Sequence, residues 1–168
     1  MAQVYVSVGS NIHRQRNIAA ALQALTGIYG ELQQSSVYES AAVGFDSAPF
    51  YNLVLGFATQ QSQQAVQEQL HAIENRLWRQ RTAALSARTL DLDLLLYDNH
   101  VMTDCKLVLP RDDINRYAFV LRPLAEIAGT VRHPVTGVTF ADMWAAFDGE
   151  MQPLIPVDWP AAATAAEE

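Results

Sequence analysis

Arg88-Thr89-Leu90-Asp91-Leu92-Asp93-Leu94-Leu95-Leu96-Tyr97 places two carboxylates two residues apart in a segment that otherwise has the composition of a buried strand. Because successive side chains of a strand point to opposite faces, Asp91 and Asp93 share one face and the leucines around them share the other. A buried charge is costly unless it is paired or binds a cation. The stretch therefore predicts a strand with a cation-binding face, and a solvated face on an edge strand is the alternative.

The segment just before this strand is rich in arginine and contains no acidic residue between Glu74 and Asp91. Its arginines are Arg76, Arg79, Arg81 and Arg88. Part of this charge suits the C-terminal end of a helix, where cations are favoured. Beside two aspartates, the arginines also suit a polyphosphate, because Mg²⁺ bridges carboxylates to phosphate oxygens and guanidinium groups neutralise the remaining charge. The chain has no G-x-x-x-x-G-K-[ST] motif, so any nucleotide site is built differently.

Composition excludes several classes of protein. The 168 residues, 50% of them hydrophobic, suit one globular domain. With 11 Lys and Arg against 18 Asp and Glu, the net charge of −7 gives no support for binding nucleic acid or acidic membranes. The single cysteine, Cys105, excludes an intramolecular disulfide and a multi-cysteine zinc site. With no signal-peptide pattern and no long apolar run, we expect a cytoplasmic protein without a membrane partner.

Hydrophobic periodicity predicts alternating strands and helices. Strands are expected at residues 3–8, 36–40 and 51–59 and from Asp91 onward, and helices through residues 18–25 and over residues 62–78. The order β-α-β-β-α-β is that of a ferredoxin-like core. We therefore expect an α+β fold with a mainly antiparallel sheet flanked by helices.

Additional elements are expected after this core. After a turn near Asp98, a loop is expected through Pro110, followed by short helices over residues 119–128 and 140–147 and a small hairpin around residues 133–137. The Pro- and Ala-rich residues 153–168 are expected to form a mobile tail. The chain thus reads as one domain, residues 1–152, with a C-terminal tail.

Several short motifs occur in an order that is typical of one family. They are Val8-Gly9-Ser10-Asn11, Phe50-Tyr51-Asn52, Ile73-Glu74 followed by Arg79 and Arg81, Arg88-Thr89-Leu90-Asp91-Leu92-Asp93, and Phe119-Val120-Leu121 with Pro123-Leu124. With these motifs, residues 3–147 resemble the 6-hydroxymethyl-7,8-dihydropterin pyrophosphokinases. The resemblance implies Mg²⁺-dependent transfer of pyrophosphate from ATP to the pterin hydroxymethyl group in folate biosynthesis, with AMP as the second product.

The resemblance also implies roles for individual residues on the ATP side. Two Mg²⁺ ions would be held by Asp91 and Asp93 and would bridge ATP and the pterin hydroxyl. The catalytic arginines on the phosphates would be Arg79 and Arg88. Further ATP-binding candidates are Glu74, Arg81, Lys106 and Arg111.

On the pterin side, the resemblance implies an aromatic sandwich formed by Phe50 and Phe119. Asn52 would hydrogen-bond the edge of the ring, which needs both donors and acceptors. Val43 and Gly44, in the loop before Phe50, are the remaining pterin-binding candidates.

Three loops differ from the family pattern, at residues 40–49, 82–87 and 111–117. Leu85-Ser86-Ala87 stands where the family usually has Trp-Gly-Pro, and the loop before Gly44 lacks two usual prolines. Arg111 replaces a histidine and Tyr117 an arginine. A diverged paralogue with lost or altered transfer activity, acting as a pterin- or nucleotide-binding module, and a metal-dependent phosphohydrolase are therefore alternatives. In each case we expect a monomer or weak dimer that binds small molecules and no nucleic acid.

Overall fold

The computed structural model describes residues 1–43, 48–79 and 90–159. Within these residues a six-stranded antiparallel sheet forms the centre of the fold, in the order β5-β1-β4-β3-β8 with β2 paired to β4. Its strands are β1 (Ala2–Ser10), β2 (Gln33–Gln34), β3 (Val37–Ser40), β4 (Phe50–Thr59), β5 (Asp91–Tyr97) and β8 (Ile155–Val157). The order β5-β1-β4-β3, with a helix after β1 and another after β4, confirms the ferredoxin-like α+β prediction.

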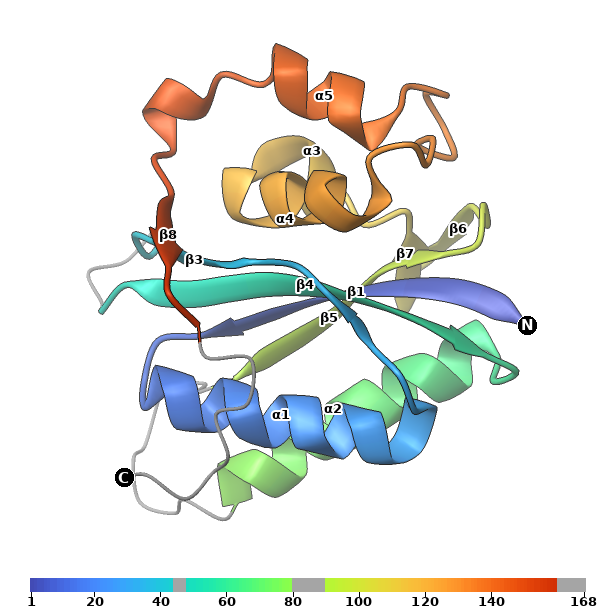
Figure 1. Cartoon of the computed structure of the whole chain (residues 1–168). Helices are drawn as coiled ribbons and strands as arrows, with labels where there is room; N and C mark the ends of the chain where they lie inside the picture. The colour runs from blue at the N-terminus through green and yellow to red at the C-terminus, as the bar shows by residue number, and fades with distance from the viewer. Residues whose placement is uncertain (44–47, 80–89, 160–168) are drawn as a thin grey trace.

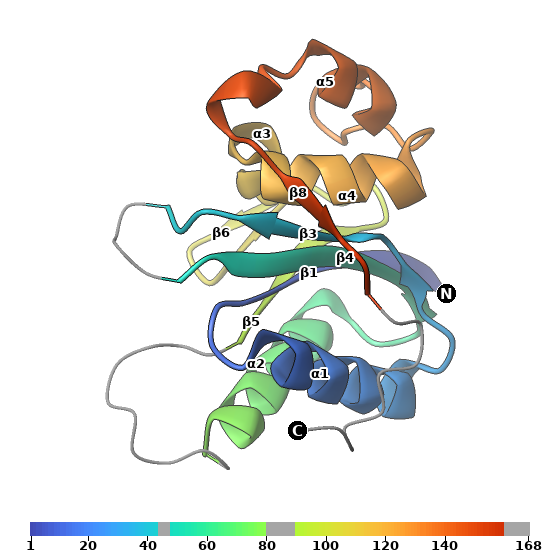
Figure 2. The ribbon, with the colours of Figure 1, turned by 60° about the vertical axis from the view of Figure 1, so that its left-hand side comes forward.

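Helices cover both faces of the sheet (Figure 1). On one face lie α1 (Arg14–Tyr29) and α2 (Gln63–Arg79). On the opposite face lie α3 (Asp113–Arg116) and α4 (Ala118–Ala128), and α5 (Phe140–Ala146) packs on α4 farther from the sheet. Figure 2 shows the same layers after a turn of 60°. The sheet therefore has a hydrophobic core on each side.

Strand alternation distributes the hydrophobic side chains between these two cores. In β1, Val4, Val6 and Val8 belong to the cluster that contains buried residues of α1 and α2, whereas Tyr5 belongs to the cluster under α4. Burying one such aliphatic side chain contributes roughly 1.5–3 kcal/mol. In β5, Leu92 lies in the first cluster, and the half-buried Asp91 and Asp93 on either side of it face the other way. The predicted division of this strand into an apolar and an acidic face is confirmed.

Two short elements were missed by the periodicity. The expected loop through Pro110 contains the hairpin β6 (Met102–Asp104) and β7 (Leu107–Leu109), and α3 forms soon after it. Each has only three or four residues, too few for a hydrophobic pattern to stand out. Around residues 133–137 the expected hairpin is reduced to one bridge, between Arg132 and Thr139.

The segment that we expected to be a mobile tail contributes a strand. After the 3-10 turn η1 (Gly149–Met151), β8 pairs antiparallel with β3, with Val157 opposite Val37 and Ile155 opposite Glu39. Val157 and Trp159 pack against the core beside α1. For residues 155–157 the tail prediction is therefore wrong, because backbone pairing and two apolar contacts hold them to the sheet.

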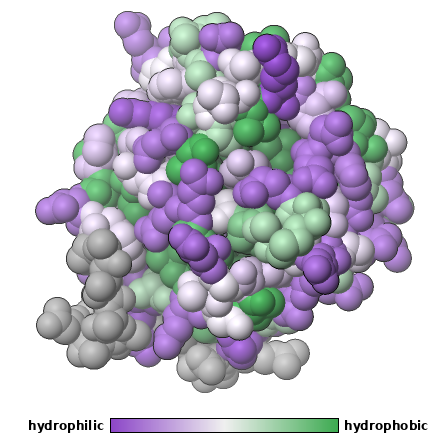
Figure 3. Space-filling model, turned by 45° about the vertical axis from the view of Figure 1, so that its right-hand side comes forward, coloured by the Kyte–Doolittle hydropathy of each residue, from purple (hydrophilic) through white to green (hydrophobic). Residues whose placement is uncertain are grey.

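Hydrophilic side chains predominate on the face that Figure 3 shows, and the hydrophobic ones there form small separate groups. Large hydrophobic side chains that are exposed come from several elements, among them Ile28 of α1, Val108 of β7 and Ile155 of β8. Within the three described ranges, no helix combines the length and apolar character that crossing a membrane requires.

Candidate active site

Two cavities meet at β5. The first, the aromatic cavity, has a volume of about 250 Å³ and is lined by Ser7, Val8, Gly9, Ser40, Ala41, Val43, Phe50, Asn52, Asp91, Asp93, Asp113, Tyr117 and Phe119. The second, the basic cavity, has a volume of about 230 Å³ and is lined by Gln67, Leu70, His71, Leu92, Asp93, Leu94, Cys105, Lys106, Leu107, Val108 and Arg111. Asp93 lines both cavities and Asp91 only the aromatic one. The acidic face of β5 is therefore shared between two adjoining spaces.

The pairing of β5 with β1 sets the position of the two aspartates. Asp91 lies opposite Gly9, and Asp93 lies opposite Ser7. β5 is at one edge of the sheet. Its two aspartates are nevertheless half-buried, and both carboxylates line the wall of the aromatic cavity and do not belong to a flat solvated face. The alternative prediction is thus correct in making β5 an edge strand, but the aspartates do not lie on a solvated face.

Gly9 lets β1 approach the far wall of the aromatic cavity. A Cβ atom at this position would lie 3.2 Å from Asn52 Oδ1 and 3.8 Å from the Phe50 ring. Asn52 itself is buried, and its Nδ2 donates to Ser40 Oγ at 2.8 Å and to the Tyr38 carbonyl at 3.5 Å. These bonds orient the amide so that Oδ1 lies on the Gly9 side.

Aromatic rings form another part of the same wall. Phe119, near the start of α4, stacks on Tyr117 with ring centroids 4.9 Å apart and an angle of 16° between the planes. Phe50, the first residue of β4, also lines the cavity, as does the exposed Val43. Of the predicted pterin residues, Val43, Phe50, Asn52 and Phe119 therefore come together, and Gly44 lies outside the described residues.

Arg111 lies where the two cavities adjoin. Its Nε donates to Asp113 Oδ2 at 3.0 Å, and its Nη2 lies 3.6 Å from Asp93 Oδ1. Burial disfavours the charged guanidinium, but Asp93, Asp113 and Asp91 outweigh that effect and raise the pKa of Arg111. A permanent positive charge is therefore held next to the acidic face of β5.

The remaining described ATP candidates lie on the α2 side. Lys106, in the turn between β6 and β7, lines the basic cavity, and its carbonyl accepts from Gln67 Nε2 at 3.0 Å. Glu74 is not among the residues that line either cavity, and its Oε2 accepts from the backbone N–H of Leu92 at 3.2 Å. Glu74 thus contacts the strand between the two aspartates.

The other predicted arginines cannot be placed. Arg79 is the last residue of α2, but its side chain belongs to the part of the chain that is not described. Arg81 and Arg88 lie outside the described residues. Their predicted roles stay predictions.

Sequence reasoning missed several residues of this site. Asp113 is two positions after the predicted Arg111, and Tyr117 is two positions before the predicted Phe119. This proximity in sequence is the signal that could have identified them. Ser7 precedes the Val8-Gly9-Ser10-Asn11 motif and Ser40 begins the loop at residues 40–49, but their place in the cavity follows from strand pairing with Asp93 and Phe50.

The donor set suits a magnesium ion that arrives with a phosphate ligand. Among the described residues, no group of three or more His, Cys, Asp and Glu side chains is close enough to hold a metal ion. Mg²⁺ commonly binds through one or two carboxylates together with waters and substrate phosphates, and not in a complete protein cage. Asp91 and Asp93 on one strand face fit that mode of binding.

Comparison with known proteins identifies the family. Residues 5–129 match the model of the family described as 7,8-dihydro-6-hydroxymethylpterin-pyrophosphokinase (HPPK). The 2-amino-4-hydroxy-6-hydroxymethyldihydropteridine pyrophosphokinase of Haemophilus influenzae is 34% identical over 138 residues, which cover 80% of this chain and 86% of that protein. The Bacillus subtilis enzyme of the same name is 32% identical over 136 residues, covering 79% and 81%.

Longer proteins also contain a segment that matches this chain. The folic acid synthesis protein fol1 of Pneumocystis carinii is 32% identical over 158 residues, which cover 91% of this chain but only 21% of that protein. The crystal structure of Plasmodium falciparum HPPK-DHPS with SDX-DHP superposes with a TM-score of 0.71 over 90% of this chain and 44% of the other, at 12% identity. From its own motifs, the family match and these relatives, the chain belongs to the 7,8-dihydro-6-hydroxymethylpterin-pyrophosphokinase family.

Proposed function

We propose that the protein transfers pyrophosphate from ATP to 6-hydroxymethyl-7,8-dihydropterin, with the pterin in the aromatic cavity and ATP in the basic cavity. One observation carries the proposal: Asp93 lines both cavities, which lie on the two sides of the acidic strand. A carboxylate in that position borders both substrates at once. The family membership supports the same reaction.

The aromatic cavity has the chemistry of a pterin site. Its Phe50, Tyr117 and Phe119 rings offer flat apolar surfaces for a bicyclic heteroaromatic ring. Since the Nδ2 group of Asn52 is occupied by Ser40 and Tyr38, its Oδ1 is the atom left to accept from the ring edge. We infer that Val43 and Gly44 border the same ring.

The basic cavity has the charge that a triphosphate requires. Lys106 and Arg111 supply cations on its wall, and the raised pKa of Arg111 keeps that group charged at any physiological pH. We infer that Arg79, Arg81 and Arg88 add further positive charge to the phosphates, with Arg79 and Arg88 as the catalytic pair. Glu74 supports the nucleotide side through its contact with β5.

Asp91 and Asp93 would hold the two Mg²⁺ ions expected with ATP and pterin. When bound, such ions neutralise phosphate charge and help to align the reacting groups. The two aspartates keep their carboxylates on one side of the strand, and Arg111 limits the net negative charge between them and Asp113.

In the reaction, the pterin hydroxyl oxygen attacks the β-phosphorus of ATP and forms a new O–P bond. The bond between the β-phosphorus and the α,β-bridging oxygen breaks, AMP leaves, and the hydroxyl proton is released. The protein contributes by holding the two substrates in line across β5 and by neutralising charge. We also infer that the protein works in the cytoplasm as a monomer or weak dimer, which its acidic composition and single cysteine suit.

The test is to incubate the purified protein with ATP and Mg²⁺, with and without 6-hydroxymethyl-7,8-dihydropterin, and to measure AMP. AMP that appears only with the pterin supports the proposal. Pterin binding without AMP would favour a diverged binding module, and nucleotide hydrolysis without pterin would favour a phosphohydrolase. The Asp91→Asn and Asp93→Asn variants should lose activity and should also lose Mn²⁺ binding, which electron paramagnetic resonance measures. Retention of both properties would contradict the metal site.

A further inference from the structure

Arg14, the first residue of α1, joins the two strands on either side of residues 41–49. Its Nη1 donates to Glu39 Oε2 at 3.0 Å and to the Pro49 carbonyl at 3.2 Å. The guanidinium carbon lies 3.8 Å from the centroid of the Tyr51 ring. One side chain therefore contacts the end of β3, the residue before β4 and the second residue of β4.

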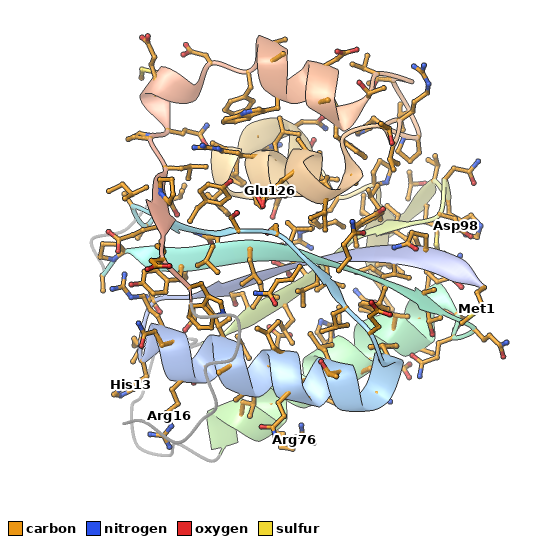
Figure 4. The ribbon with its side chains drawn as sticks, in the orientation of Figure 1. Met1, His13, Arg16, Arg76, Asp98 and Glu126 are labelled. Carbon is orange, nitrogen blue, oxygen red and sulfur yellow. The ribbon has the colours of Figure 1, made fainter. Side chains whose placement is uncertain are left out.

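The position of Arg14 is not explained by helix formation. The first turn of α1 contains no acidic residue, and Arg14 and Arg16 bring positive charge to the helix end where it is disfavoured. His13 adopts a left-handed conformation at φ 44°. Figure 4 shows His13 and Arg16 at the start of α1, below the end of the sheet where β4 begins. The favourable interactions of Arg14 are thus with the sheet.

The contacts of Arg14 surround a single residue of the aromatic cavity. Pro49 and Tyr51, which it contacts, are the neighbours of Phe50 in the chain. Glu39 and Tyr51 are also partners in the β3–β4 ladder, and Ser40 and Phe50 are the next pair. Because side chains alternate along a strand, Arg14 holds Glu39 and Tyr51 on the α1 face while Ser40 and Phe50 point into the cavity on the other.

We propose that Arg14 is a positioning residue for pterin recognition, which fixes the backbone of Phe50 from the opposite face of the sheet. The choice of the pterin as the ligand in this inference rests on the proposed function. A charged donor with two acceptors and an aromatic contact contributes more binding free energy between side chains than a neutral hydrogen bond does. None of the residues that Arg14 contacts lines the basic cavity. Arg14 therefore affects the pterin side of the reaction and not the ATP side.

The test compares Arg14→Met and Arg14→Lys with Arg16→Met, a matched control because Arg16 is exposed on the same helix. Arg14→Met should raise the KM for the pterin about tenfold, because a charge-assisted contact that positions Phe50 is lost. Both kcat and the KM for ATP should change less than about twofold. Arg14→Lys keeps the charge and N–H donors and should recover part of the loss. Arg16→Met should behave like the unmodified protein.

A second measurement does not depend on any substrate. Amide hydrogen exchange of residues 48–53 should be faster in Arg14→Met than in Arg16→Met. Unchanged exchange, or equal effects on the pterin and ATP constants, would overturn the positioning role. Faster exchange in a protein that binds no pterin would support the positioning of Phe50 and overturn the proposed function instead.

Discussion

Glu74 Oε2 lies 3.2 Å from the backbone nitrogen of Leu92 and accepts its hydrogen, so a helix residue holds the strand position between Asp91 and Asp93. β5 is at the edge of the described sheet, where a side-chain acceptor replaces the missing neighbouring strand. The geometry of the two aspartates thus depends on α2 as well as on β1. Glu74 acts on the carboxylates through the backbone between them.

Glu74→Leu should lower the affinity for divalent cations by about tenfold or more, as loss of groups that orient metal ligands commonly does. Titration with Mn²⁺ in the presence of an ATP analogue measures this effect. Glu74→Gln keeps an acceptor for the Leu92 N–H and should lie close to the unmodified protein. Equal losses in both variants would mean that the charge of Glu74 matters and its hydrogen bond does not.

Gly9→Ala should separate stability from pterin affinity. Replacing a strand glycine reduces the freedom of the unfolded chain and adds about 0.5–1 kcal/mol of stability where space allows. The new methyl group would lie 3.2 Å from Asn52 Oδ1 and would displace the amide. We expect a several-fold weaker pterin affinity, measured by pterin fluorescence, with a Tm that is unchanged or higher. A parallel loss of Tm and affinity would indicate general damage to the sheet.

Arg111→Met should raise the KM for ATP about tenfold, because it removes one charge-assisted phosphate contact. Arg111→His introduces a group whose ordinary pKa is near 6.5 and which the same aspartates would raise, so its KM for ATP should increase as the pH rises above that value. The unmodified protein should show no such dependence, since the neighbouring aspartates raise the pKa of Arg111 still further above its ordinary value. A flat pH profile for Arg111→His would show that this cation does not contact ATP.

His133 should make the protein less stable in acid. The ring is buried, its Nδ1 accepts from the N–H groups of Val135 and Thr136, and burial lowers the pKa of His133 below 6.5. The unfolded chain therefore binds a proton more readily than the folded one, and the free energy of unfolding falls as the pH decreases below about 6.5. The slope from one such group is at most about 1.4 kcal/mol per pH unit.

Urea unfolding at pH 7.5 and pH 5 measures this dependence. His133→Asn keeps an acceptor for the two N–H groups but does not titrate, so its stability should vary less with pH. His71→Gln replaces an exposed histidine and is the control. If His133→Asn keeps the full pH dependence, another group is responsible.

The family, the fold class and the pyrophosphokinase assignment predicted from the sequence are confirmed. They depend on patterns that are local in the chain, such as the leucines of β5 and the helical spacing of Val66, Leu70 and Ile73 in α2. Local patterns also marked Asp91, Asp93, Phe50 and the other matching positions, whose individual roles stay predictions. The confirmed part of the prediction is therefore the part that short sequence motifs determine.

Apart from the short β6–β7 hairpin and α3, what the sequence did not reveal depends on distant partners. β8 forms because β3 offers an edge more than a hundred residues earlier in the chain, and Pro156 in its middle hides it from strand patterns. The contacts of Arg111 with Asp93 and of Arg14 with Glu39 likewise join residues from separate elements. Side-chain pairs of this kind depend on the tertiary fold, so a single sequence does not reveal them.

The place of Asp93 in the walls of both cavities has a thermodynamic consequence. A ligand that changes the field or the position of this carboxylate from one side changes the free energy of binding on the other. Such a coupling is reciprocal, so the factor by which ATP alters the affinity for the pterin must equal the factor by which the pterin alters the affinity for ATP. The order in which the two substrates bind then reflects their concentrations and rates, while the free energy of the ternary complex is the same by either route.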